Sequence, residues 1–255
     1  MKSQAQPITL LTIDQGNSSA KAVVWQDGEP VEWVRFSDLD IEALLPILDR
    51  YELEGCAFCS VSHNDAKFLE TLRRLLDGRL VVLTPALPLP IKIRYSSRST
   101  LGSDRVAAAV GAVSLFSSEA LLVVDAGTAI TLDFVSADGE FLGGNIAPGM
   151  KMRFDSLSRY TSRLPLVEAS GEIPLFGEDT LTAIRCGVER GMAAEVADAY
   201  RLAYARFGCR RVVMTGADAE LLSKLVMEKG IEVTVDKFLV GRGLKEIYRQ
   251  DITHD

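Results

Sequence analysis

The sequence predicts an α/β protein built from two copies of one β-β-β-α-β-α-β-α unit. An apolar run at residues 8–13 leads into the polar turn at 14–17 (Asp-Gln-Gly-Asn), and a second apolar run at 121–124 leads into 125–128 (Asp-Ala-Gly-Thr). Placing Asp14 on Asp125 also aligns two later hairpin signals, Asp27-Gly28 and Asp138-Gly139. Two aspartate–glycine groups that agree in phase, each beside an apolar strand, indicate an internal duplication.

The remaining elements follow from the hydrophobic periodicity of each copy. In the first copy we expect strands at 8–13, 20–25, 31–36, 55–61 and 80–84, and helices at 38–51 and 64–76; an alanine-rich helix at 106–116 lies between the two copies. In the second copy we expect an irregular stretch at 145–177, a long helix at 179–207, strands at 211–214 and 231–235, and helices at 217–228 and 241–250. The duplication divides the chain into an N-terminal half, residues 1–103, and a C-terminal half, residues 104–255.

Duplicated β-β-β-α-β-α halves characterise the superfamily of actin, Hsp70 and the sugar kinases, and the sequence resembles a small member of it. This resemblance implies ribonuclease H-like halves of the actin-like ATPase type, with the active site in the cleft between them. A fold alone does not specify a reaction, so the function has to be argued from the residues of the site.

The composition excludes several classes of function. The chain has 255 residues, with 28 Lys and Arg against 35 Asp and Glu, and its net charge of −7 disfavours binding to nucleic acid or to anionic membranes. No apolar run reaches the roughly 18 residues of a membrane-spanning helix, and the first seven residues lack the apolar stretch of a signal peptide. These features predict a cytoplasmic protein.

The cysteines fit a reducing compartment, because four in a chain of this size are too few for a disulfide framework. Cys56 and Cys59 have the spacing of a metal or redox pair, but they lie in a predicted strand, where positions i and i+3 face opposite sides. The two histidines, His63 and His254, do not complete a zinc-ligand pattern. We therefore expect Cys56 and Cys59 to pack in the core.

Each Asp-x-Gly turn carries groups suited to a nucleotide. A carboxylate at the end of a buried strand can bind the magnesium of MgATP, the glycine lets the backbone approach a phosphate, and the next side chain can donate a hydrogen bond. In the first turn these groups are Asp14, Gly16, Asn17, Ser18 and Ser19, with Lys21 adding positive charge. The alternative is that Asp14 and Asp125 only cap their turns.

A second candidate site, Gly102-Ser103-Asp104-Arg105, precedes an alanine-rich helix. A helix start favours anions, and a carboxylate beside a guanidinium suits the phosphorylation of a small hydroxy acid: Asp104 would accept the hydroxyl proton and Arg105 would hold the acid group. The alternative is that Asp104 is simply the N-cap of the helix.

These motifs, in this order, resemble the type III pantothenate kinases over essentially the whole chain. The shared motifs are D-x-G-N at 14–17, Tyr95 with G-x-D-R at 102–105, D-A-G-T-A at 125–129, G-G-N-I-A-P-G at 143–149, T-x-x-L-P at 161–165, T-x-x-A-I-x-x-G at 180–187, and Thr215-Gly216. The resemblance implies ATP-dependent phosphorylation of pantothenate to 4′-phosphopantothenate, the first step of coenzyme A synthesis.

The same resemblance implies a role for each matching residue. ATP with its Mg²⁺ would be held by Asp14, Gln15, Gly16, Asn17, Ser18, Ser19, Ala20 and Lys21, with Asp14 on the magnesium, and by Thr128. Pantothenate would be bound by Tyr95, Gly102, Ser103, Asp104, Arg105 and Thr180, with Asp104 as the catalytic base. Asp125 would bind a monovalent cation, K⁺ or NH₄⁺. Members of the family are homodimers with the site at the interface, so Thr180 would act across it.

The long helix at 179–207 bears on the dimer, because its apolar residues recur at helical spacing. They are Ile184, Val188, Met192, Val196, Ala199 and Ala203. This stripe predicts either a dimer interface or an ordinary core helix, and the family resemblance favours the interface.

Some positions depart from the family pattern. Ser97-Arg98 stand where the family often has Asn-Pro, Ser18 where it often has Thr, and Ala217 where a second glycine is common. Three other readings stay open: a different small-molecule kinase of the superfamily, a regulatory protein that binds nucleotide without turnover, and an actin-like filament protein.

Overall fold

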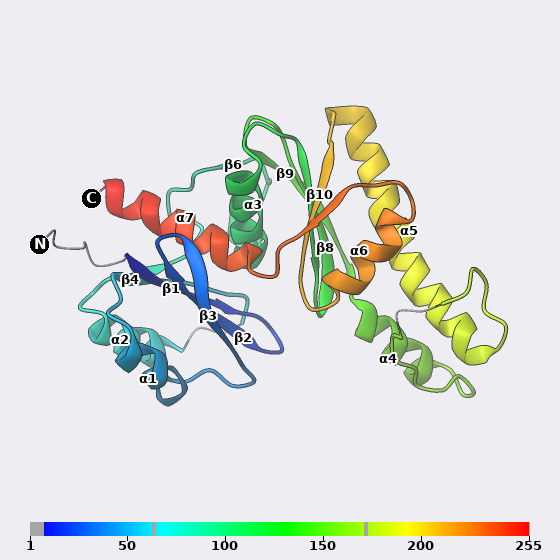
Figure 1. Cartoon of the computed structure of the whole chain (residues 1–255), viewed down its shortest axis with the longest axis horizontal. Helices are drawn as coiled ribbons and strands as arrows, with labels where there is room; N and C mark the ends of the chain where they lie inside the picture. The colour runs from blue at the N-terminus through cyan, green and yellow to red at the C-terminus, as the bar shows by residue number, and fades with distance from the viewer. Residues whose placement is uncertain (1–7, 63–64, 171–172, 255) are drawn as a thin grey trace, which may run out of the picture. The chain divides into compact units, whose positions relative to one another are not determined.

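The computed structural model describes residues 8–62, 65–170 and 173–254, which pack into two compact units (Figure 1). The first unit comprises the described residues of Met1–Ile91, Ser96–Ser114 and Phe238–Asp255, and the second comprises those of Lys92–Tyr95 and Leu115–Lys237. His63 lies outside the described residues. Within the described ranges, every helix is too short or too polar to cross a membrane.

The first unit is built on a five-stranded sheet in the order β3-β2-β1-β4-β5. Its strands are β1 (Thr9–Gln15), β2 (Ala20–Gln26), β3 (Glu29–Phe36), β4 (Gly55–Ser60) and β5 (Leu80–Val82). The turn between β2 and β3 is tight because Asp27 and Gly28 both adopt positive φ, at 50° and 94°, as the Asp-Gly pair predicted. Strand β1 lies at the centre, antiparallel to β2 and parallel to β4.

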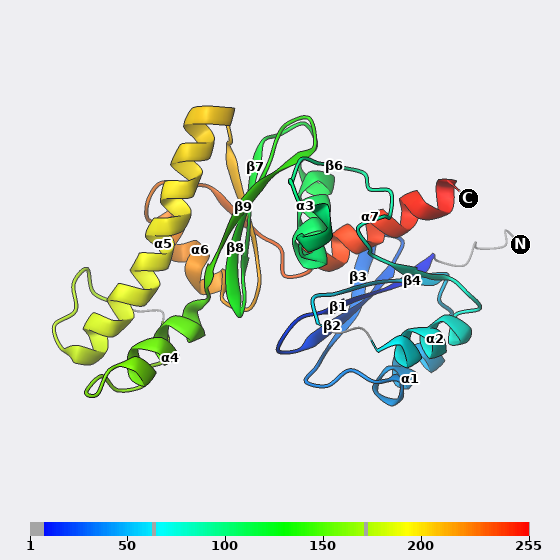
Figure 2. The same cartoon turned by 180° about the vertical axis from the view of Figure 1, so that it is seen from behind.

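Helices cover both faces of this sheet (Figures 1 and 2). Helices α1 (Ile41–Arg50) and α2 (Ala66–Leu75), whose N-caps are Asp40 and Asp65, pack on the face that carries Leu11 and Ile13. Helix α7 (Leu239–His254) packs on the opposite face. Helix α3 (Ser103–Leu115) and the short 3-10 turn at Arg98–Thr100 complete the unit.

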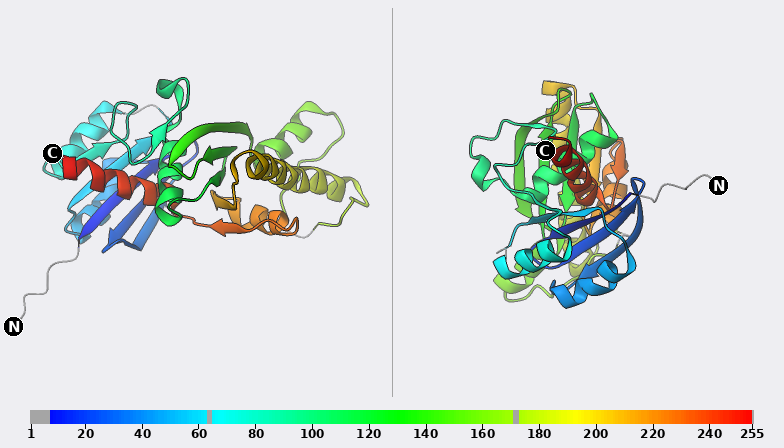
Figure 3. Two further views of the ribbon diagram at one scale, coloured as in Figure 1. Left: turned by 90° about the horizontal axis from the view of Figure 1, so that it is seen from above. Right: turned by 90° about the vertical axis from the view of Figure 1, so that its left-hand side faces the viewer.

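The second unit repeats this plan on a six-stranded sheet in the order β11-β10-β7-β8-β9-β6. Its strands are β6 (Lys92–Ile93), β7 (Leu121–Ala126), β8 (Ala129–Val135), β9 (Glu140–Pro148), β10 (Arg211–Thr215) and β11 (Val233–Val235). Helices α4 (Met150–Tyr160), α5 (Thr180–Phe207) and α6 (Ala219–Met227) contribute to a single apolar core against one face of this sheet (Figure 3).

The two sheets confirm the internal duplication. The order β3-β2-β1-β4-β5 matches β9-β8-β7-β10-β11, and each copy reads β-β-β-α-β-α-β-α once α4 is counted as an insertion. Asp14 and Asp125 occupy equivalent places, since each lies near the end of the central strand. The predicted duplicated α/β fold is therefore correct.

One predicted segment is wrong. The stretch at 145–177 was expected to be irregular, but β9 runs to Pro148 and α4 occupies Met150–Tyr160. Helix α4 packs Met150, Phe154 and Leu157 against the core at helical spacing, but it is short and its remaining residues are mostly polar, so the pattern was not recognised in the sequence.

The long helix α5 forms as predicted. Asp179 caps it through a reciprocal capping box with Thr182, and Gly208 ends it in the left-handed conformation at φ 68°. Its apolar stripe, however, packs into the core of the second unit, so the stripe itself is not an interface.

The packing units do not follow the division at residue 104, because α3 and α7 both belong with the first unit. The division of the chain into halves at residues 1–103 and 104–255 therefore stays a prediction.

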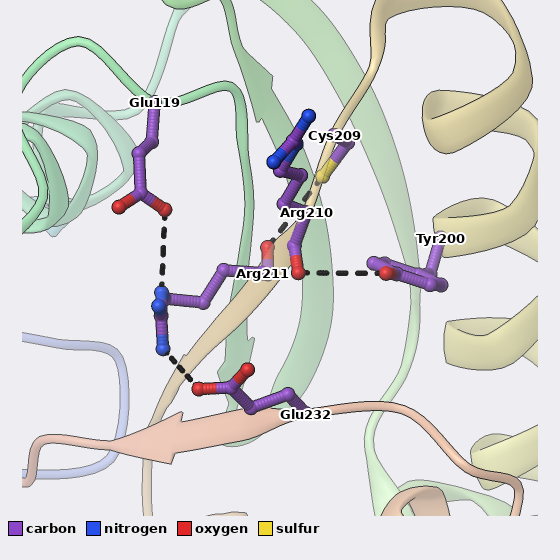
Figure 4. A network of polar contacts seen from close by, with 6 residues as sticks. All are labelled: Glu119, Tyr200, Cys209, Arg210, Arg211 and Glu232. Carbon is purple, nitrogen blue, oxygen red and sulfur yellow. Dashed lines mark hydrogen bonds and ion pairs between the residues drawn. The ribbon is translucent and has the colours of Figure 1, made fainter.

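The side chain of Arg211 adds polar contacts on both sides of β10, which the backbone pairs with β7 and β11 (Figure 4). Its Nε donates to Glu119 at 3.4 Å, its Nη1 pairs with Glu232, and the guanidinium lies 4.3 Å from the ring centroid of Phe116. Glu119 precedes β7 and Glu232 precedes β11, so these contacts come from both neighbours of β10. Strand β10 ends at Thr215, before Gly216.

Close packing of α3 against α7 depends on two glycines, and this generates a stability prediction. A Cβ at Gly243 would lie 1.8 Å from the Ala107 carbonyl oxygen, and one at Gly111 would lie 2.2 Å from the Leu239 carbonyl oxygen. We expect Gly243→Ala to lower the free energy of unfolding by about 1–3 kcal/mol, because the helices would have to separate.

Urea unfolding would measure the difference. The matched control is Gly191→Ala in α5, where a Cβ meets no atom within 4 Å. That variant should gain up to about 1 kcal/mol, as expected of alanine in a helix. Equal effects of the two substitutions would contradict the packing argument.

Candidate active site

The first part of the site is the turn between β1 and β2. Asp14 stands opposite Lys21 in the antiparallel register, and the amide of Gly16 donates to the carbonyl of Ser19 at 3.0 Å. Asn17 and Ser18 are exposed at the tip of the turn. The hairpin thus gathers the predicted segment 14–21 into one place, with a carboxylate and an ammonium group at its base.

The second part is the start of α3, which lies in the same unit. The Asp104 carboxylate accepts a hydrogen bond from the Arg105 amide at 2.7 Å, and the Ser103 hydroxyl donates to the carbonyl of Ser60 at 2.9 Å. A Cβ at Gly102 would lie 2.5 Å from Asp104 Oδ1, so only glycine leaves room for this carboxylate. Helix α3 begins at Ser103, earlier than predicted, which places Asp104 inside its first turn.

Arg105 is buried, with 5% of its surface exposed. Its positive charge acts on Asp104 and favours the ionised carboxylate. The buried guanidinium therefore stabilises the negative charge of Asp104.

The Asp14 and Asp104 carboxylates interact electrostatically. Burial, and then the negative charge of Asp104, raise the pKa of Asp14 to about 6, although Lys21 and a hydrogen bond from Cys59 act in the opposite direction. Burial also raises the pKa of Asp104, against the effects of the Arg105 amide and charge. Buried carboxylates with shifted pKa values are typical of a functional site.

Cys59 is a contact that the sequence analysis missed. Its thiol donates to Asp14 Oδ1 at 3.5 Å, and burial together with the two nearby carboxylates raises its own pKa. Cys56 packs in the opposite core, so the two cysteines face different sides as expected. Alignment of β4 with β1 could have revealed the contact, since parallel strands end at the same edge.

The other predicted residues lie in the second unit. Asp125 is the penultimate residue of β7, and the adjoining turn is closed by the amide of Gly127, which donates to the carbonyl of Ala129 at 3.0 Å. Gly216, at φ 101°, lies so close that a Cβ would be 2.6 Å from Asp125 Oδ1. Thr128 is exposed in this turn.

Tyr95 and Thr180 lie elsewhere in the second unit. The Tyr95 ring packs edge-on against Phe141, with 6.1 Å between centroids. Thr180 is the exposed first residue of α5, beside the N-cap Asp179. Tyr95 and Thr180 therefore come from different elements of the second unit than Asp125 and Thr128, which share the β7–β8 turn.

The fold and the paired aspartate turns define an actin-like ATPase or kinase architecture. The ADPNP-bound activator of 2-hydroxyisocaproyl-CoA dehydratase from Clostridium difficile superposes with a TM-score of 0.55 at 12% identity, covering 97% of this chain and 98% of its own. At that identity the likeness shows the fold alone.

Sequence comparison narrows this class to a family. The profile of the type III pantothenate kinases matches residues 10–202. The type III pantothenate kinase of Phocaeicola vulgatus is 39% identical, over 93% of this chain and 96% of its own, and that of Porphyromonas gingivalis is 37% identical, over 91% and 95%. This chain belongs to the type III pantothenate kinase family.

A solved structure from Campylobacter jejuni carries a different description. It is described provisionally as a Baf family transcriptional activator, and it superposes with a TM-score of 0.63 at 25% identity, covering 95% of this chain and 99% of its own. A regulatory alternative therefore has to be tested against the chemistry of the site.

The raised pKa of Asp14 generates a prediction about stability. Because the folded-state pKa of about 6 exceeds the ordinary value of 3.8, folding disfavours the ionised carboxylate. This cost is absent below about pH 4, grows as the pH rises through 4–6, and is complete above pH 6. We expect Asp14→Asn to raise the free energy of unfolding at pH 8 by up to about 3 kcal/mol, and to change it little at pH 4.

Urea unfolding at the two pH values would measure the change. The control is Asp49→Asn, an exposed aspartate on α1. A gain for Asp14→Asn that is the same at pH 4 and pH 8 would show that the buried charge is not its cause.

Proposed function

We propose that this chain phosphorylates pantothenate with ATP to give 4′-phosphopantothenate, the first step of coenzyme A biosynthesis, with Asp104 as the catalytic base. Membership of the type III pantothenate kinase family supports the overall reaction. The observation that supports the site is the pair of interacting carboxylates, Asp14 and Asp104, at the β1–β2 turn and the start of α3. A cytoplasmic location is part of the proposal, because free cysteines fit a reducing compartment.

The β1–β2 turn is suited to the phosphates of MgATP. Asp14 supplies a carboxylate for the magnesium, Lys21 supplies positive charge, and residues 15–20 offer backbone amides and hydroxyl groups at an exposed turn. Thr128 would add a hydroxyl from the equivalent turn of the second copy. In this assignment Asp14 acts on the nucleotide.

Asp104 is the better candidate for the base. Phosphoryl transfer proceeds through a loose transition state, so the base has only to orient the substrate hydroxyl and accept its proton late. The raised pKa of Asp104 makes it a better proton acceptor than an ordinary aspartate, and the neighbouring Arg105 keeps it ionised. Pantothenate would also contact Tyr95, Gly102, Ser103, Arg105 and Thr180.

A purified-protein assay tests the reaction and the base together. ATP consumption, coupled to ADP detection, should occur with pantothenate and not with hexoses or acetate. Asp104→Asn should lower kcat by about 10² to 10⁴, the usual contribution of a general base, while the affinity for MgATP is retained. A near-normal kcat in this variant would remove Asp104 from the mechanism, and Asp14 would become the base to test.

The same assay separates the alternatives. A different superfamily kinase would turn over one of the other substrates, whereas a regulatory protein would bind nucleotide without hydrolysis or transfer. The net charge of −7 argues against binding to DNA. The second carboxylate, Asp104, argues against a protein that only binds nucleotide, because binding alone does not need a base. Both arguments favour the enzyme.

The proposal includes a monovalent cation at Asp125. This carboxylate is half-buried beside the Gly127–Thr128 turn, where K⁺ or NH₄⁺ would place positive charge near the triphosphate. We expect activity to rise roughly tenfold or more when K⁺ or NH₄⁺ replaces Na⁺, since a preorganised charge stabilises the transferring phosphoryl group. The stimulation should be lost in Asp125→Ala. Equal rates with K⁺, NH₄⁺ and Na⁺ would refute the cation role.

A homodimer is the last part of the proposal. Beyond its core stripe, the C-terminal end of α5 exposes Leu202, Tyr204 and Phe207, and a groove of about 670 Å³ there is lined by residues of α5, β8 and β9. Phe207 stacks on Phe134 at 4.5 Å and forms part of this apolar surface. Exposed apolar surface of this kind is typical of an interface.

Sedimentation equilibrium tests the dimer. The wild type should sediment as a dimer, and Leu202→Glu should shift it to a monomer, because a charge would be buried in the interface. Leu75→Glu, at an exposed leucine of α2 in the first unit, is the matched control. A wild-type monomer with full activity would rule out a shared site.

A further inference from the structure

Cys59 lies directly beside the carboxylate that we assign to MgATP. Strands β1 and β4 are parallel, and their register places Cys59 opposite Asp14. The Cys59 sulfur is 3.5 Å from Asp14 Oδ1, and the residue is fully buried, with 0% of its surface exposed. A thiol keeps its proton at neutral pH, so Cys59 is the donor and the carboxylate is the acceptor.

The next residue of β4 contacts the other half of the site. The carbonyl of Ser60 accepts a hydrogen bond from the Ser103 hydroxyl at 2.9 Å, and Ser103 immediately precedes Asp104 in the first turn of α3. The end of β4 therefore touches both carboxylate-bearing elements, with the Cys59 side chain on Asp14 and the Ser60 backbone on α3.

The second copy of the fold shows the same arrangement. Strand β10 is the counterpart of β4, and its register places Thr215 opposite Asp125 as Cys59 is placed opposite Asp14. Thr215 is also buried, with 3% of its surface exposed. In both copies, therefore, the strand parallel to the central strand places a thiol or hydroxyl side chain opposite the aspartate of the turn.

A redox role does not fit Cys59. Cys56, the nearest cysteine in sequence, lies in the core on the opposite face of the sheet, so the two thiols cannot meet without breaking the strand. Full burial also keeps oxidants and thiol reagents away. We therefore look for the role of Cys59 in its hydrogen bond to Asp14.

We propose that Cys59 is a positioning residue whose thiol holds the Asp14 carboxylate in the orientation that meets the magnesium of MgATP. Cys59 does not itself contact the substrates. The inference rests on the assignment of Asp14 to MgATP, and it gives β4 a role in the reaction through the orientation of that side chain.

The test is a double-mutant cycle between Cys59 and Asp14, read by calorimetric binding of MgATP in the absence of pantothenate. Cys59→Ala should weaken MgATP binding roughly tenfold, the scale expected for a weak donor to a charged acceptor. Cys59→Ser, which keeps a donor, should retain most of the affinity. In the Asp14→Asn background Cys59→Ala should cause no further loss, because the group that it orients is gone.

Two controls separate positioning from packing. Cys56→Ala makes a similar cavity in the same strand but should leave MgATP binding unchanged. Metal-free ATP should bind the wild type and Cys59→Ala equally, and the KM for pantothenate should change less than twofold. The free energy of unfolding, measured for Cys59→Ala and Cys56→Ala, would show whether the cavities are comparable.

The outcomes are distinct. If Asp14→Asn binds MgATP normally, the assignment of Asp14 is wrong and this inference falls with it. If Asp14→Asn weakens binding and Cys59→Ala does not, the assignment stands and only the positioning role is overturned. A loss for Cys59→Ala that persists in the Asp14→Asn background would also overturn it, since the effect would then not act through Asp14.

Discussion

The burial of two carboxylates, Asp14 and Asp104, is the physical constraint on which the rest of this site depends. Water would screen the two charges, but burial removes much of it and raises both pKa values. The surrounding groups reduce this cost: Lys21 across the hairpin acts on Asp14, and Arg105 acts on Asp104. Holding these two carboxylates therefore costs folding free energy, as is common where a fold keeps charged groups for function.

Much of the fold could be predicted because the same turn residues recur at the same spacing in both copies. The Asp-Gly signals fixed the hairpins, and the apolar runs located the central strands, so Asp14 and Asp125 were correctly placed at equivalent strand ends. Helix α4 was missed because it is short and most of its residues are polar. The contact of Cys59 with Asp14 was missed because the sequence analysis did not align β4 with β1, and the exact register of two strands is not visible in a single sequence. In α5, the hydrophobic periodicity correctly predicted an apolar face. It could not show that this face packs in the core of the second unit.

The two copies keep one backbone plan and differ in charge. Opposite Asp14 the antiparallel register places Lys21, whereas opposite Asp125 it places Thr131. The first turn therefore has its own cationic side chain and the second does not. The proposed monovalent cation would supply at the second turn the positive charge that a lysine supplies at the first.

Helix α7 has a consequence for synthesis of the chain. It packs on the sheet of the first unit, where Gly241 approaches Thr12 and Trp25, and the Tyr248 hydroxyl donates to the carbonyl of Glu54 at 3.2 Å. The ribosome makes this helix only after the whole second unit. Until then one face of the N-terminal sheet stays uncovered, so the half that is made first is completed last. Sequence-distant contacts of this kind slow folding and leave apolar surface open to chaperones.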